Sequence, residues 1–284
     1  MKHHLLALLL LVSSSIYAAT GTVEGVRMPI WVEQDGVMSA LAPGMRLHTT
    51  DAVTTGEGGR LLLRLDDGAL VRLGENAQLA LDDLKSSKGM DSGHIAVSVK
   101  KGSFRLKTGG LKKLVNVTAG SLAASGSSMD ICGRASDERD AIALMAKGRA
   151  NVEHDSASHA TLTRARTFVD ALNGGSLNAV NKVNPKDYAS WIAQTDLQSG
   201  KGVVTRKGHW KVDLGAFQQR AEAESVRQSV DKEGYAVTLF PANIQDKTYW
   251  RPQVLHFKTQ HDAVVAAEQL RSIFDTLSIT TQSK

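Results

Sequence analysis

The sequence predicts a multidomain protein in which an all-β domain precedes a small α+β domain of βαββαβ order. Two observations lead to this prediction. Between Thr20 and Cys132, short runs of β-forming residues alternate with Gly and Asp, a pattern typical of an all-β roll, sandwich or barrel. From Trp210 to Thr280, two successive strand–helix–strand patterns predict a small sheet with both helices on one face.

The N-terminal segment, residues 1–19, has the features of a secretory signal peptide. Lys2 supplies a positive charge, and the apolar run Leu5–Val12 is too short to span a bilayer. The small residues that follow allow cleavage after Ala18 or Ala19, and no Cys at that position offers a lipid attachment site. No later apolar run is long enough for a membrane span. We therefore expect an exported, soluble protein.

The charge of the chain is mildly positive, with 34 Lys and Arg against 29 Asp and Glu and a formal net charge of +5. Because this excess is small and dispersed, we expect no nucleic-acid partner. The densest basic stretch lies between Lys100 and Lys113. We interpret it as solvated strand and turn residues, and the alternative is a surface that faces an anionic cell wall.

The β domain, which we place at residues 20–180, contains a clear hairpin signal. Leu61–Leu65 and Ala69–Leu73 flank the turn sequence Asp66-Asp67-Gly68. Further strands are expected where apolar residues alternate, at Ile95, Val97 and Val99, at Phe104 and Leu106, and at Val115 and Val117.

Several short motifs in this domain resemble the FecR family of periplasmic domains. They are Gly44–Leu47, Asp51–Gly56, Gly59–Leu61, Asp67–Leu73 and the small-residue strand Ala124–Ile131. The resemblance covers roughly residues 21–175 and implies closing strands at Ala141–Met145, Gly148–Val152 and Ala160–Val169. Some FecR proteins relay signals, and others are envelope proteins joined to cell-wall-binding modules. The relay requires a cytoplasmic segment and a membrane span. We find neither in this sequence, so we expect the second role.

Residues 181–207 are predicted to link the two domains. Pro185–Ile192 predicts a short helix with Pro185 in its first turn. Tyr188, Trp191 and Ile192 share one face of that helix and are expected to cover an edge of the β domain. The following segment, Gln198–Gly202, is expected to be a flexible hinge.

The C-terminal domain, which we place at residues 208–284, opens with a strand over Trp210–Phe217 that ends in a tight turn. A helix follows, with an apolar stripe from Ala223 to Val230 and Gly234 as its stop.

The second half of this domain repeats the pattern. Strands are expected at Tyr235–Phe240, Trp250–Phe257 and Leu277–Thr280. Between the last two, Thr259 can cap a helix, with Asp262 three positions later completing a capping box. With both helices on one sheet face, the other face is expected to be open. By alternation, that face carries Lys211, Asp213, Arg251 and Gln253.

The C-terminal domain resembles the SPOR (sporulation-related repeat) family of bacterial cell-wall modules. The matching residues are Val212, Leu214-Gly215, Phe217, Arg251 and Phe257, and the resemblance covers roughly residues 208–279. It implies an RNP-like fold, a periplasmic location and binding to peptidoglycan glycan strands that have lost their stem peptides, mostly at the division septum.

Glycan-binding residues follow from this resemblance and from the expected open face. Arg251 is the strongest candidate, because its planar guanidinium can hold a lactyl carboxylate or an acetamide oxygen. The predicted set contains hydrogen-bonding and aromatic residues, namely Trp210, Asp213, Phe217, Trp250, Arg251 and Gln253. The alternative for Trp210 and Trp250 is packing at the sheet edge, and that for Asp213 is a salt bridge to Lys211 or Arg251.

This chain departs from the usual SPOR pattern at four positions. Asp213 stands where Gln is usual, Ala216 where Ser is usual, Leu255 where Gly is usual and Pro252 where Val is common. Pro252 cannot donate to a sheet ladder. These departures support the alternative that the protein is a periplasmic interaction adaptor or signalling domain with a degenerate SPOR fold and no glycan binding. Under the glycan-binding hypothesis, the β domain would meet a periplasmic protein partner or the wall.

The sequence offers little catalytic or metal-binding chemistry. It has no Gly-x-Ser-x-Gly elbow and no His-Glu-x-x-His motif. The only cysteine, Cys132, excludes an internal disulfide, and we interpret it as a small apolar residue inside a strand, with a free thiol or an intermolecular partner as alternatives. His154 and His159 flank a polar loop that is a weak metal-site alternative, while Asp66-Asp67 and Asp82-Asp83 are interpreted as turn residues. We expect no catalytic residue, metal or cofactor; a wall-modifying enzyme remains a third hypothesis.

Overall fold

The computed structural model describes residues 19–83, 95–109, 114–154 and 158–283. The predicted signal peptide lies outside the described residues except for Ala19, which begins β1 (Ala19–Arg27). Lys112 and Lys113 of the basic stretch also lie outside them, whereas Lys100 and Lys101 are exposed strand residues, as expected.

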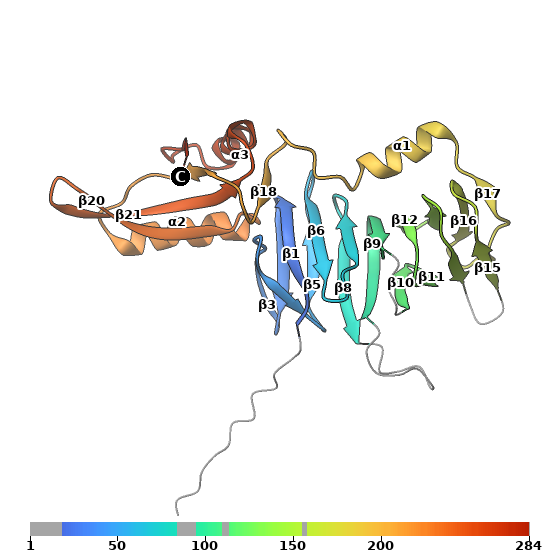
Figure 1. The fold of residues 1–284 in the computed structure, drawn as a ribbon. Helices are drawn as coiled ribbons and strands as arrows, with labels where there is room; N and C mark the ends of the chain where they lie inside the picture. Colours follow the sequence, from blue (N-terminus) through green and yellow to red (C-terminus); the bar gives the residue numbers. More distant parts are fainter. Residues whose placement is uncertain (1–18, 84–94, 110–113, 155–157, 284) are drawn as a thin grey trace, which may run out of the picture.

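The N-terminal region is built of strands, and Figure 1 shows them side by side along one elongated body (Figure 1). After β1 these strands are β2 (Ile30–Gln34), β3 (Val37–Ala40), β4 (Arg46–His48), β5 (Ala52–Thr55), β6 (Arg60–Leu65), β7 (Leu70–Leu73), β8 (Gln78–Asp83), β9 (Ile95–Lys107), β10 (Val115–Ala119), β11 (Leu122–Gly126), β12 (Asp130–Ala135), β13 (Arg139–Leu144), β14 (Ala150–Glu153), β15 (His159–Leu162), β16 (Thr167–Leu172) and β17 (Asn181–Lys182).

These strands form two hydrogen-bonded ladders that share β9. One ladder runs β1–β6–β7–β9–β12–β13–β16–β17, and the other runs β3–β2–β5–β8–β9–β10–β11–β14–β15. Both ladders contribute alternate apolar residues to one core, for example Leu61 and Leu63 from the first and Val53 and Leu79 from the second. The predicted all-β domain is confirmed.

Strand β9 belongs to both ladders because its pairing partners change at Gly102. Its first half pairs with β8 and β10, and its second half pairs with β7 and β12. Gly102 has φ +94°, and a Cβ there would lie 2.2 Å from the Cβ of Ala77. The expected alternation at Val97 and Val99 and at Phe104 and Leu106 is present, but it belongs to one continuous strand.

The predicted hairpin is formed by β6 and β7, and Asp67 accepts a hydrogen bond from the backbone N–H of Ala69 within its turn. Two other strand predictions were wrong in extent. The run Ala124–Ile131 is divided between β11 and β12, and Ala160–Val169 is divided between β15 and β16. The second break coincides with Arg166, whose φ of +62° cannot continue a strand.

The predicted linker helix is α1 (Pro185–Ala193), capped by the side chain of Asn184, with Pro185 in its first turn. Tyr188, Trp191 and Ile192 pack against a small cluster that includes Cys132. Because β12 and β13 lie inside their ladder, α1 covers a sheet face, and the expectation that it covers an edge was wrong.

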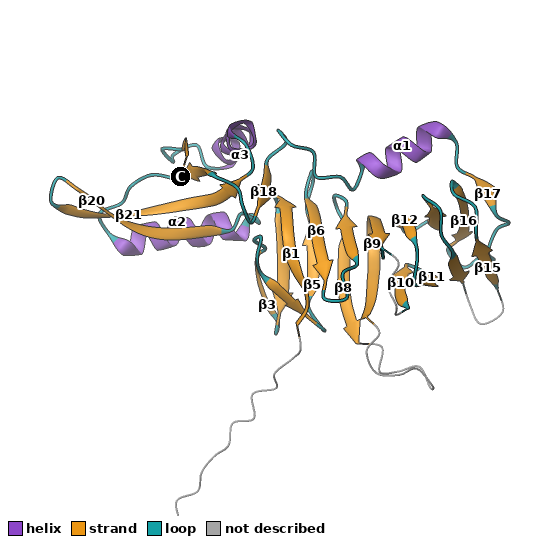
Figure 2. Cartoon of the chain, viewed as in Figure 1, coloured by secondary structure: helices purple, strands orange, loops and turns teal. Residues whose placement is uncertain are grey.

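The C-terminal domain contains an antiparallel sheet in the order β22–β19–β21–β20. Its helices, drawn in purple in Figure 2, pack on the same side because both share one core with Val212 and Val254 (Figure 2). The elements are β19 (Trp210–Asp213), α2 (Arg220–Lys232), β20 (Val237–Ile244), β21 (Lys247–Phe257), α3 (Gln260–Ile273) and β22 (Thr280–Ser283). This order and packing confirm the predicted α+β domain.

The predicted capping box is present, with Thr259 as the N-cap of α3 and Asp262 as its partner. Several strand boundaries differ from the prediction: β19 ends at Asp213 and β21 begins at Lys247. Strand β20 begins after Tyr235 and continues to Ile244, because Gln245 and Asp246 adopt positive φ and close a tight hairpin with β21. The last strand begins at Thr280, so the predicted strand Leu277–Thr280 lies three residues too early.

The two domains meet through the segment that was expected to be a flexible hinge. Strand β18 (Val203–Thr205) pairs with β1, and Val204 also pairs with Phe257 of β21. The backbone N–H groups of Gly202 and Val203 both donate to Asp262 Oδ1. The structure thus anchors the end of this segment, contrary to the hinge prediction, while the domain boundaries themselves stay predictions.

Candidate functional site

The polar residues singled out in the sequence meet on two neighbouring strands of the C-terminal sheet. Asp213 ends β19, and Gln253 lies directly opposite it in β21. Arg251 is two residues before Gln253, so both side chains extend from the same face of β21. This face is opposite to the one that carries Pro252 and Val254, which are buried on the helix side.

These three side chains form a hydrogen-bonded group, which we call the polar triad (Asp213, Arg251 and Gln253). Asp213 Oδ2 accepts from Arg251 Nη2 at 2.7 Å and from Gln253 Nε2 at 2.8 Å. Its second oxygen, Oδ1, accepts from the backbone N–H of Gly215 at 3.1 Å. The alternative of a salt bridge between Asp213 and Arg251 is therefore present in the structure.

The expected open polar face was wrong in one respect. Asp213 and Gln253 are buried, with relative exposures of 2% and 5%. Arg251 is the member of the triad that reaches solvent, with 26% of its side chain exposed. Its Nε is buried and has no hydrogen-bond partner among the described residues. The triad can thus offer a ligand one oriented, partly exposed guanidinium, while its Nε is out of reach of solvent.

The three aromatic candidates lie on the other side of the sheet. Trp210 pairs with Phe257, which is buried in the core, and Trp210 itself packs against that core. Phe217 and Trp250 exchange both backbone hydrogen bonds, so their side chains share a face, and Arg220 of α2 lies 4.9 Å over the Trp250 ring. The structure therefore brings the polar candidates together and separates them from the aromatic ones.

Two residues beside the triad were missed in the sequence. Phe240 of β20 lies opposite Arg251 in the ladder and is 38% exposed. Tyr249, two residues before Arg251, shares its face, and its hydroxyl accepts a hydrogen bond from Gln218. The sequence signal for Phe240 was the alternation of Thr238 and Phe240 with Val237 and Leu239. This alternation shows that Phe240 shares the face of the triad only once the register between β20 and β21 is known.

The remaining candidates, Cys132 and His154, are held by contacts within the protein. Cys132 is buried in β12, as expected for a small apolar strand residue, and burial raises the pKa of its thiol to about 12. His154 Nε2 lies 2.7 Å from the carbonyl oxygen of Gly175. Within the described ranges, no group of three or more His, Cys, Asp or Glu side chains is arranged to hold a metal ion.

Comparison with protein families identifies both domains. Residues 51–150 match the family model described as FecR protein, and residues 207–276 match the one described as SPOR domain. The match to the FecR model thus precedes the match to the SPOR model along the chain. Both are binding or regulatory families, and SPOR domains generally bind peptidoglycan and are typical of envelope proteins.

Other comparisons add little to this assignment. No curated protein matches the chain. Two crystal structures of a proposed anti-sigma factor from Parabacteroides distasonis are 14% identical, with a TM-score of 0.41; each covers 82% of this chain, and the chain covers 99% or 98% of theirs. In the part of the chain that the structure describes, no helix is long and apolar enough to cross a membrane.

Proposed function

We propose that this protein is a non-enzymatic periplasmic envelope protein that binds peptidoglycan glycan strands through its SPOR domain. The match of residues 207–276 to the SPOR family carries the proposal. The ligand-binding group is the partly exposed guanidinium of Arg251, held by Asp213, whose carboxylate is held in turn by Gln253. Phe240 and Tyr249 supply neighbouring surface for the sugar rings.

The aromatic candidates Trp210, Phe217 and Trp250 have a different part in this proposal. Because they lie on the helix side of the sheet, we assign them a supporting role in the fold around the triad. The alternative role is contact with a glycan strand beyond the end of the sheet. A role in cell division or wall organisation, with septal recruitment, extends the same proposal.

Co-sedimentation with purified sacculi tests this function. The wild-type protein is expected to pellet better with sacculi that an amidase has stripped of stem peptides, and Arg251→Ala is expected to stay in the supernatant. Arg251→Lys keeps the charge but loses the planar fork, so it should bind weakly. Thr248→Ala, at an exposed position of the same strand, is the matched control. Circular dichroism of each variant separates lost binding from lost folding.

A second candidate function is a periplasmic protein-interaction adaptor or signalling module. The burial of Asp213 and Gln253 favours it, because their polar groups are satisfied within the protein. The FecR match is also compatible with signalling. Absence of sedimentation for a folded wild-type protein, with or without amidase treatment, would favour this function over glycan binding.

A further inference from the structure

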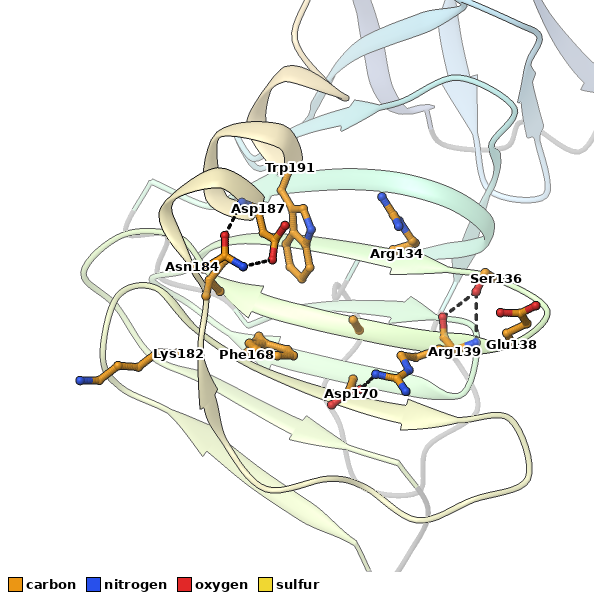
Figure 3. Close-up of a pocket in the computed structure, with 12 residues that line it drawn as sticks. Arg134, Ser136, Glu138, Arg139, Phe168, Asp170, Lys182, Asn184, Asp187 and Trp191 are labelled. Carbon is orange, nitrogen blue, oxygen red and sulfur yellow. Dashed lines mark hydrogen bonds and ion pairs between the residues drawn. The ribbon is translucent and has the colours of Figure 1, made fainter.

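A cavity of about 550 Å³ lies between α1 and the outer face of the sheet formed by β12, β13 and β16 (Figure 3). It is far in the sequence from the polar triad, and its walls come from the FecR region and the linker helix. Its volume is in the range of small-molecule sites. Figure 3 shows Trp191 of α1 projecting from above toward the Phe168 side of the sheet.

One wall of the cavity is aromatic. The rings of Trp191 and Phe168 meet edge to face, with centroids 6.3 Å apart and an interplanar angle of 74°. In an edge-to-face pair at most one face of one ring is covered, so each ring keeps at least one face that its partner does not cover. Trp191 is half-buried and lines the cavity, which leaves ring surface for a flat apolar ligand face.

The opposite wall is polar and held in place. Arg139 Nη1 donates to Asp170 Oδ2 at 2.8 Å; the side chain of Asp170 is 5% exposed and that of Arg139 is 55% exposed. Arg134 is fixed by a hydrogen bond from its Nη2 to Gln194 Oε1 at 3.0 Å. These contacts leave further guanidinium N–H groups for a ligand oxygen, in orientations set before binding.

The charges around the cavity select against an ion. Three cationic side chains, Arg134, Arg139 and Lys182, are matched by three carboxylates, Glu138, Asp170 and Asp187. A polyanion would meet repulsion from the carboxylates, and a cation would meet it from the guanidinium groups. A neutral ligand with one apolar face and a rim of hydrogen-bonding groups fits both walls.

We propose that this cavity binds a neutral sugar of one or two pyranose rings. The C–H face of one ring would pack on Trp191, while hydroxyl or carbonyl oxygens would accept hydrogen bonds from Arg139 and Arg134 and a hydroxyl would donate to Asp170. This would be a carbohydrate site of the FecR region and α1, independent of the proposed glycan binding by the SPOR domain.

Nuclear magnetic resonance of the tryptophan indole N–H groups tests the site directly. The protein is produced without residues 1–18 and with Arg251→Ala, so that binding by the SPOR domain does not contribute. Diacetylchitobiose is added to about 10 mM, a concentration that saturates a millimolar site. The indole signal of Trp191, assigned with Trp191→Phe, is expected to shift saturably, while that of Trp31 stays in place.

Two variants and one control locate the binding. Ala141→Leu fills the cavity floor, and Arg139→Gln removes the guanidinium but keeps an amide that can donate to Asp170; each is expected to weaken binding at least tenfold, with circular dichroism as the check on folding. Ala189→Leu, at an exposed position of α1, should bind as the parent does. No shift of Trp191, or an equal shift in Ala141→Leu with its fold intact, would overturn the proposal. A saturable shift with D-alanyl-D-alanine but not with diacetylchitobiose would assign the cavity to a peptide and overturn the sugar.

Discussion

Asp262 in α3 accepts a hydrogen bond from the backbone N–H of Val203 at 2.9 Å, across nearly sixty residues of sequence. The same Oδ1 accepts from Gly202, and Oδ2 accepts from the backbone and hydroxyl of Thr259. The side chain is fully buried. A single carboxylate therefore caps α3 and fixes the approach to β18.

Replacing Asp262 should destabilise the protein substantially. Asp262→Ala leaves two buried backbone N–H groups unpaired and removes the cap, so we expect a loss of about 2–4 kcal/mol in the free energy of unfolding. Urea unfolding followed by circular dichroism measures it. Asp275→Ala, at an exposed position after α3, should change stability by less than about 0.5 kcal/mol. Equal effects of the two substitutions would contradict the anchoring role.

The ion pair of the polar triad should contribute to stability as well as to binding. Arg251→Ala leaves the buried carboxylate of Asp213 without its cation, and we expect a loss of about 2 kcal/mol. The double variant with Asp213→Ala should lose less than the sum of the two single losses, because each single change strands the other group. Urea unfolding of the four proteins gives the coupling. Additive losses would show that the two residues do not depend on each other.

The contact between α2 and the FecR region depends on Gly234. Its carbonyl accepts from Ile30 N at 3.1 Å, its φ is +79°, and a Cβ there would lie 2.8 Å from both Ile30 N and Trp31 Cε2. Gly36 has a similar φ of +76° but no atom within 4 Å of a built Cβ. The two positions therefore share the backbone strain and differ in the clash.

We expect Gly234→Ala to cost more stability than Gly36→Ala. The control should lose about 1 kcal/mol from the left-handed backbone alone, and Gly234→Ala should lose roughly 1–3 kcal/mol more from the steric clash. Calorimetry measures both melting temperatures. If the melting temperatures fall equally, the tight contact at Gly234 does not contribute.

Cys132 should report the opening of α1. Burial keeps its thiol protonated, because the pKa is raised to about 12, so the native protein should react slowly with a thiol reagent at about pH 8. Trp191→Ala removes part of the cover over the Cys132 cluster and should speed labelling roughly tenfold. Lys186→Ala, exposed on the same helix, should leave the rate unchanged. A rate unaffected by either change would exclude exposure through α1.

The raised pKa of Cys132 also predicts how the stability of the protein changes with pH. The folded pKa of Cys132 lies above its usual 9.0, so its contribution to stability is full below that value and is lost as pH rises toward about 12. Cys132→Ala should therefore lose less stability than the wild type between about pH 8 and pH 10.5. A steeper loss in the variant would contradict the shift.

Local sequence signals predicted the elements that depend on near neighbours. The hairpin of β6 and β7 follows from Asp67-Gly68, and α3 follows from Thr259 and Asp262, because each pattern is complete within a few residues. The broken strand at Arg166 and the later start at Thr280 depend on turn conformations and pairing partners that single-strand alternation does not encode.

The candidate site was predictable in composition but not in arrangement. The expected polar face correctly grouped Asp213, Arg251 and Gln253, because alternation within each strand fixes a side. Their burial and mutual hydrogen bonds depend on a register between residues forty positions apart. Trp250 lies two residues before Pro252, so alternation alone places it on the helix side, whereas its pairing with Phe217 depends on the irregular backbone at Gly215.

Strand β18 has a mechanical consequence. Val204 is paired with Val26 of the FecR region and with Phe257 of the SPOR domain. If the SPOR domain is held on a stretched cell wall, tension that enters through β21 reaches β1 across this short strand, in parallel with the contact at Gly234, and a load along the strands meets the hydrogen bonds in shear. The strength of the contact between the two domains, and not the length of a flexible linker, would then set the force at which the FecR domain separates from the SPOR domain.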